Sequence, residues 1–227
     1  MSNREQRTYR GVNLRAVGDG TTEPMMLQGY AAIFGSYSHD LGGFREKIKP
    51  GAFQRAISEK QDVRFLMNHD PNVVLGRTKS GTLVLREDDK GLFFRVNLPD
   101  TQAARDLHTS IGRGDMDQCS FSFKVVDGGQ TWGEDKDSSG YFATREVSNV
   151  DLFDVSAVTY PAYEDTSVSA RELIPAEVRS SVEAKNKSRI VVPTVTREFD
   201  LEKYRETHLS LEEQIELRDY LRSILEF

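Results

Sequence analysis

The chain has 227 residues, 37% of them hydrophobic and 29% charged, which is typical of one soluble globular domain with a polar extension. The formal net charge of -6 disfavours nonspecific binding of nucleic acid, and a single cysteine excludes an intrachain disulfide and favours a reducing compartment. No apolar run approaches the roughly 20 residues of a membrane helix, and residues 1–10 lack the apolar centre of a secretory signal. We therefore expect a cytoplasmic protein, or one inside an assembly built in a cytoplasm, that binds neither nucleic acid nor membranes.

The distribution of glycine divides the chain into two parts. All 17 glycines lie between Gly11 and Gly140, and none follows. Because tight turns favour glycine, residues 1–170 are predicted to form a β-rich domain. Residues 171–227 are predicted to form a linker and an amphipathic C-terminal helix.

Within the first part, the spacing of apolar residues predicts alternating strands and two helices. The second helix begins at Asp100 or Thr101, either of which can cap it, and can end at Gly112. In chain order, the expected elements are strands at 8–17 and 27–34, a helix at 51–58, a strand at 63–69, a hairpin over 82–98 and a helix at 100–112.

The strand predicted next, residues 116–126, carries a distinctive pattern. Cys119, Phe121 and Phe123 alternate with Ser120 and Ser122, so the apolar set faces one side of the sheet and the hydroxyls the other. The aromatic face can pack in a core. The serine face is left free for chemistry, or has no role.

The rest of the chain is predicted in less detail. Residues 127–140 form a polar, acidic loop that could act as a lid, and strands follow at 142–147 and 150–160. Residues 175–193 show no clear period and are interpreted as a linker. Ser210 and Glu213 fit a capping box at the start of a helix whose apolar stripe must dock on the domain, a second copy or a partner.

Several well-known catalytic and binding motifs are absent. The sequence contains no Walker-type phosphate loop, Rossmann glycine fingerprint, HExxH, paired cysteines or G-x-S-x-G elbow. The four histidines are scattered without metal-ligand spacing. No cofactor and no metal are therefore expected.

A serine nucleophile needs a neighbouring base, and His69, at the end of a predicted strand, is the best candidate for the base of Ser120. Asp154 lies in an otherwise apolar strand, where a buried carboxylate needs a partner such as an imidazolium. Asp151 is a second choice, because it points to the other face if the strand is regular. Cys119 competes as nucleophile, but its place among the phenylalanines is typical of a small core residue. The alternatives are structural: His69 as a polar strand cap bonded to Asp70, which is favoured for a lone histidine, and Asp154 on an exposed face of its strand.

Five segments taken together resemble the prohead, or head-maturation, proteases of tailed bacteriophages. They lie in the order of that family and span about residues 8–170. They are GYAAIFG at 29–35, FREKIKPGAFQRAI at 44–57, FLMNHDPNVVLGRT at 65–78, QCSFSF at 118–123 and DLFDVSAVTYPAYEDTSV at 151–168.

The resemblance implies a fold and a site. The family is similar to the herpesvirus protease assemblin, so we expect a mainly β, α+β fold with a closed or partly closed antiparallel barrel, a few helices and a C-terminal helical tail. It implies His69 as general base and Ser120 as nucleophile, with Asp154 where assemblin has a second histidine. It places the oxyanion hole near residues 160–165. Ser122 departs from the glycine of many relatives.

The resemblance also implies a setting. The protein would be a serine endopeptidase inside the assembling prohead, in the host cytoplasm, that cleaves the scaffolding segment of the major capsid protein and itself. A homodimer is expected by analogy with assemblin. The tail could be a packaging element removed by self-cleavage, or a plain helix that stabilises the domain or a dimer. The alternatives are a non-catalytic capsid-assembly factor and a cysteine peptidase that uses Cys119.

Overall fold

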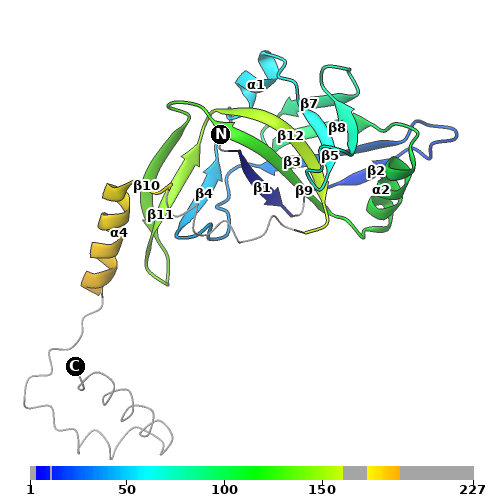
Figure 1. The fold of residues 1–227 in the computed structure, drawn as a ribbon. Coiled ribbons are helices and arrows are strands. Elements are labelled where there is room, and N and C mark those ends of the chain that lie inside the picture. Colours follow the sequence, from blue (N-terminus) through cyan, green and yellow to red (C-terminus); the bar gives the residue numbers. More distant parts are fainter. Residues whose placement is uncertain (1–3, 11, 161–172, 190–227) are drawn as a thin grey trace, which may run out of the picture. The chain divides into compact units, whose positions relative to one another are not determined.

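The fold of the protein, seen in a computed structural model that describes residues 4–10, 12–160 and 173–189, is mainly β (Figure 1). No helix in these ranges is long and apolar enough to span a membrane. The helices are α1 (Gln54–Ser58), α2 (Gln102–Arg113) and α4 (Ala176–Arg189). The strands are β1 (Glu5–Tyr9), β2 (Arg15–Val17), β3 (Met26–Ile33), β4 (Phe44–Ile48), β5 (Arg64–Met67), β6 (Val74–Arg77), β7 (Leu83–Glu87), β8 (Gly91–Asn97), β9 (Gln118–Val125), β10 (Gln130–Lys136), β11 (Tyr141–Val147) and β12 (Val150–Val158).

The described strands form three sheets. Their orders are β1-β9-β12-β5-β6, β2-β3-β8-β7 and β10-β11-β4. Most neighbours are antiparallel, but β12 pairs with β5 and β11 pairs with β4 in parallel. The expected mainly β fold is confirmed, whereas the expected closed antiparallel barrel is not found among the described residues. The sheets have open edges, and the two parallel pairs join strands that are distant in sequence.

The main core packs the five-stranded sheet against the four-stranded one. Phe65 of β5 and Phe94 of β8 approach with ring centroids 5.1 Å apart. On β9, Phe121 stacks on Phe123 at 4.9 Å and meets Phe53, the residue before α1, edge-to-face at 5.3 Å. All five rings are fully buried. The apolar face predicted for this strand is therefore the face that forms the core.

Three sequence predictions differ from the structure. The strand predicted over residues 8–17 is two strands, β1 and β2, in different sheets. The predicted loop at 127–140 contains β10, a polar edge strand whose Trp132 packs on Phe44 with centroids 5.0 Å apart. The predicted linker contains α4, because Ile174 and Val178 join a second small core around Phe44.

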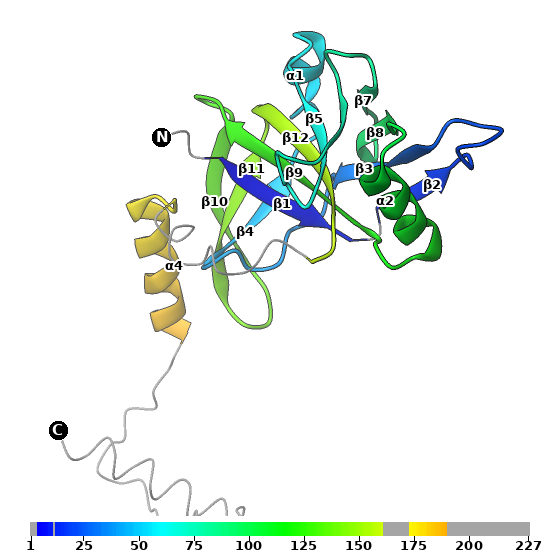
Figure 2. The same cartoon turned by 45° about the vertical axis from the view of Figure 1, so that its right-hand side comes forward.

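Helix α4 lies beside β10 and β11, as both ribbon views show (Figures 1 and 2). Ser181 donates a hydrogen bond to Glu134 of β10, and the Asn186 amide bonds both the backbone N–H and the carbonyl of Tyr141 at 2.8 Å. The predicted boundary near residue 170 and the predicted helix from Ser210 lie outside the described residues.

A buried ion-pair network ties β1 to the three-stranded sheet. The Arg7 guanidinium donates to Glu46 at 2.7 Å and to Glu5 at 2.8 Å, and Arg145 donates to Glu5 at 2.5 Å and to Glu46 at 2.9 Å. Only 2% of the side chains of Glu46 and Arg145 is exposed. Burial alone would raise the pKa of Glu5, but the hydrogen bond from Arg145 and the charges of both arginines lower it. The four charges therefore depend on one another.

We expect Arg145→Met to destabilise the fold by about 3–5 kcal/mol, because removal of one partner leaves buried carboxylates uncompensated. Chemical denaturation followed by circular dichroism measures the free energy of unfolding. The matched control is Arg113→Met, which breaks an exposed pair with Asp115 at 3.0 Å and should cost less than about 1 kcal/mol. Equal losses in the two variants would contradict a structural role for the buried network.

Candidate active site

Strand β12 lies between β5 and β9, and its register brings polar residues together. Asp154 lies opposite Ser122 and Ser156 lies opposite Ser120 on β9, while Ala157 lies opposite Met67 on β5. Directly opposed residues in a sheet project from the same face. One face of the sheet therefore carries three serine hydroxyls and the carboxylate of Asp154, next to the end of β5.

His69 reaches this face from the turn that follows β5. Asn68 and His69 have φ values of 52° and 57°, the left-handed conformation that few non-glycine residues adopt. The Asn68 N–H donates to the Ala157 carbonyl at 2.9 Å, and its side-chain oxygen accepts from the Thr159 N–H at 2.9 Å. These bonds hold the turn against the end of β12. The sequence predicts His69 as a strand end, whereas the structure places it in a fixed turn.

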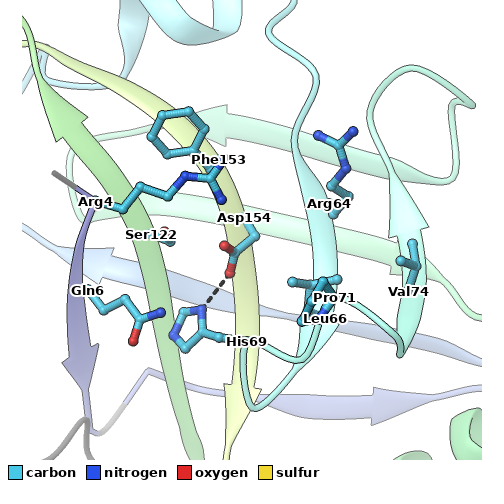
Figure 3. A pocket seen from close by; sticks show the side chains of 10 residues that line it. All are labelled: Arg4, Gln6, Arg64, Leu66, His69, Pro71, Val74, Ser122, Phe153 and Asp154. Atoms are coloured by element: carbon cyan, nitrogen blue, oxygen red, sulfur yellow. Dashed lines mark hydrogen bonds and ion pairs between the residues drawn. The ribbon is translucent and has the colours of Figure 1, made fainter. Parts of the chain in front are cut away.

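The imidazole of His69 bridges a serine and a carboxylate. Its Nε2 lies 2.7 Å from the Ser120 Oγ. Its Nδ1 lies 2.5 Å from an Asp154 oxygen, the contact drawn as a dashed line in Figure 3. The exposed fraction is 12% for the His69 side chain, 9% for that of Asp154 and zero for Ser120. This arrangement can move a proton from the hydroxyl to the imidazole while the carboxylate balances the charge that forms.

Ser120 has a second acceptor. Its Oγ lies 3.0 Å from the carbonyl oxygen of Arg7 on β1, the strand that pairs with β9 so that Thr8 lies opposite Ser120. Ser122 is also buried, with 2% exposed. The serine face is therefore not open to water at Ser120 and Ser122, and the Ser120 hydroxyl instead meets His69 and a carbonyl of β1.

The alternative residues are not brought to His69. Asp151 accepts from Arg55 at 2.5 Å and from Gln61 at 2.8 Å, and the hydrogen bond from Arg55 is the main reason why the pKa of Asp151 is lowered. Cys119 is fully buried, and burial raises the pKa of its thiol, which disfavours the reactive thiolate. His108 instead lies with its Nε2 3.2 Å from the carbonyl of Val17.

A cavity of about 360 Å³ opens beside the imidazole. Asp154 and His69 line one part of it, and Arg4 lies over the ring of Phe153 at 4.1 Å from its centroid (Figure 3). The other lining residues are Gln6, Arg64, Leu66, Pro71, Val74 and Ser122. The cavity could receive part of a peptide next to the histidine. The residues expected near an oxyanion hole, 160–165, lie outside the described part of the chain except for Tyr160.

Sequence reasoning missed Asn68 and Ser156. Asn68 precedes the histidine, and asparagine is among the residues that best tolerate a left-handed conformation. Ser156 follows Asp154 by two positions, so the period of a strand places both on one face. These two sequence signals could have identified both residues. Among the described residues, no group of three or more His, Cys, Asp or Glu side chains could hold a metal ion.

Comparisons with known proteins identify the family of the chain. The model of the caudovirus prohead serine protease family matches residues 11–181. A solved structure, the capsid assembly protease of bacteriophage T4, is similar at 12% identity with a TM-score of 0.40, over 70% of this chain and 98% of that chain. A search of curated protein sequences returned no match. Since the family model covers most of its length, the chain belongs to the caudovirus prohead serine protease family.

Proposed function

We propose that the protein is a serine endopeptidase in which Ser120 is the nucleophile, His69 the general base and Asp154 the residue that orients the base. The observation that carries this proposal is the continuous set of contacts from the Ser120 Oγ through both imidazole nitrogens to Asp154, at 2.7 Å and 2.5 Å. The three residues come from three separate segments, so chain neighbourhood does not account for the alignment.

The reaction is acyl transfer. His69 takes the proton of Ser120 at Nε2 while the Ser120 oxygen attacks a peptide carbonyl carbon. The protonated imidazole then gives this proton to the leaving amine, and the C–N bond breaks. Water hydrolyses the acyl-enzyme with His69 again as base. A base of this kind contributes about 10²–10⁴-fold to the rate, and the adjacent carboxylate stabilises the imidazolium.

The family gives the setting in which the protein acts, the phage prohead. The substrates of this protein would be the scaffolding segment of the major capsid protein and the protease itself, inside the assembling head in the host cytoplasm. Dimerisation is part of the same proposal, by analogy with assemblin.

We expect Ser120→Ala to abolish processing of the coexpressed major capsid protein, because no oxygen remains to attack the peptide. Gel electrophoresis and mass spectrometry of the proheads detect the cleaved product. Since Ser120 is buried, this assay in the assembling head is preferred to labelling of the isolated chain. The matched control is the neighbouring Cys119→Ala, which should retain processing.

The rival functions predict other results in this assay. A cysteine peptidase would lose processing in Cys119→Ala and keep it in Ser120→Ala. A non-catalytic assembly factor would give the same capsid-protein pattern in both variants and in the wild type. Either result would contradict the assignment of Ser120 as nucleophile, provided that thermal melting shows both variants to be folded.

We expect Asp154→Asn to slow processing by about 10³–10⁴-fold, because an amide neither balances the imidazolium nor holds its tautomer. Asp151→Asn is the control, since Asp151 is engaged by Arg55 on a partly exposed part of β12. It should retain processing near the wild-type rate. A time course of capsid-protein cleavage compares the two variants, and a severe loss in Asp151→Asn alone would reverse the assignment.

A further inference from the structure

Ser156 makes two contacts that the proposed mechanism does not use. Its Oγ lies 3.0 Å from the same Asp154 oxygen that faces His69, and 3.2 Å from Nδ1 of His69. The residue is fully buried. A buried hydroxyl needs one hydrogen-bond partner to offset the loss of water. This hydroxyl has two possible partners, the imidazole of His69 and the carboxylate of Asp154.

The directions of these bonds follow from counting protons. A serine hydroxyl has one proton and two acceptor lone pairs. If it donated to Nδ1, that nitrogen would carry no proton and would face the Asp154 oxygen lone pair to lone pair at 2.5 Å. The favourable arrangement has the hydroxyl donating to the carboxylate and accepting, with the carboxylate, from Nδ1–H.

This arrangement determines which imidazole nitrogen can act as a base. With the proton held on Nδ1 by two acceptors, the neutral ring leaves its Nε2 lone pair directed at the Ser120 Oγ, 2.7 Å away. The second acceptor also restricts rotation of the ring about its bond to the turn. The hydroxyl thus contributes to both the tautomer and the orientation that proton transfer requires.

We propose that Ser156 is a positioning residue that acts through Asp154 and His69, holding the carboxylate and the Nδ1 proton of the base. This rests on the proposed serine peptidase function. The hydrogen bonds of its side chain go to Asp154 and to Nδ1 of His69, so its contribution lies in the alignment of the base. The competing interpretation is that its hydroxyl merely fills space in β12 and is satisfied by the nearest acceptor.

The test compares Ser156→Ala with Thr144→Val, which removes another buried hydroxyl from β11 in a different sheet. In the coexpression assay, we expect Ser156→Ala to slow capsid-protein processing by about tenfold or more, the usual effect of a lost hydrogen bond to a charged group. Thr144→Val should process at the wild-type rate. Both proteins should melt within a few degrees of each other.

A second measurement needs no activity. Proton NMR of the full chain detects the Nδ1–H signal of His69, identified by its loss in His69→Gln. We expect Ser156→Ala to shift this signal and to speed its exchange with water, and Thr144→Val to leave it in place. A hydroxyl that only fills space would leave the signal unchanged.

Each outcome decides the proposal. A signal that moves together with slower processing supports it. An unmoved signal, unchanged processing in Ser156→Ala, or absence of the Nδ1–H signal from the wild-type protein overturns it. Failure of the underlying function is distinguished by Ser120→Ala, which would then process capsid protein like the wild type.

Discussion

The backbone pairing of β12 with β5 on one side and β9 on the other is the constraint on which the site depends. This pairing places Ser156 opposite Ser120 and Ala157 opposite Met67, and Ala157 accepts the N–H of Asn68 in the turn that presents His69. A slip of one residue would turn every side chain of β12 to the other face. The core resists that slip, because Val155 and Ala157 are fully buried.

Strand β1 contributes both to the candidate site and to the stability of the fold. The Arg7 side chain belongs to the buried ion-pair network, while its backbone carbonyl accepts from the Ser120 Oγ at 3.0 Å. Because burial makes each of those charges depend on its partners, the network fixes the position of β1 against β4 and β11. The hydrogen-bonding environment of Ser120 is therefore set partly by charges on the three-stranded sheet, through the Glu46 and Arg145 side chains.

The parts of this structure that local pattern determines could be predicted from sequence. The alternation around Phe121 identified the core face of β9, and the Thr101 signal located the start of α2, which the Thr101 side chain caps as expected. The predicted end at Gly112 was wrong, because α2 continues to Arg113 and its C-cap is Gly114. The position of His69 at a predicted strand end favoured it among the four histidines, and the resemblance strengthened that choice. The rest depends on distant partners: β10 is polar and is stabilised by pairing with β11, and α4 has little amphipathic character of its own. The local sequence pattern therefore predicts neither β10 nor α4.

The contact of Asp154 with His69 shows why regular periodicity was insufficient. The pairing shifts by one residue between Leu152, opposite Phe123, and Asp154, opposite Ser122, so β12 has one extra residue at Phe153. In a regular strand, Phe153 would lie opposite Ser122, and Asp154 would lie opposite Phe121 on the core face. The bulge therefore turns the carboxylate away from the phenylalanines and toward His69, a role that bulges often have beside functional sites. A pattern of period two cannot reveal such an insertion, because only the partner strand defines it.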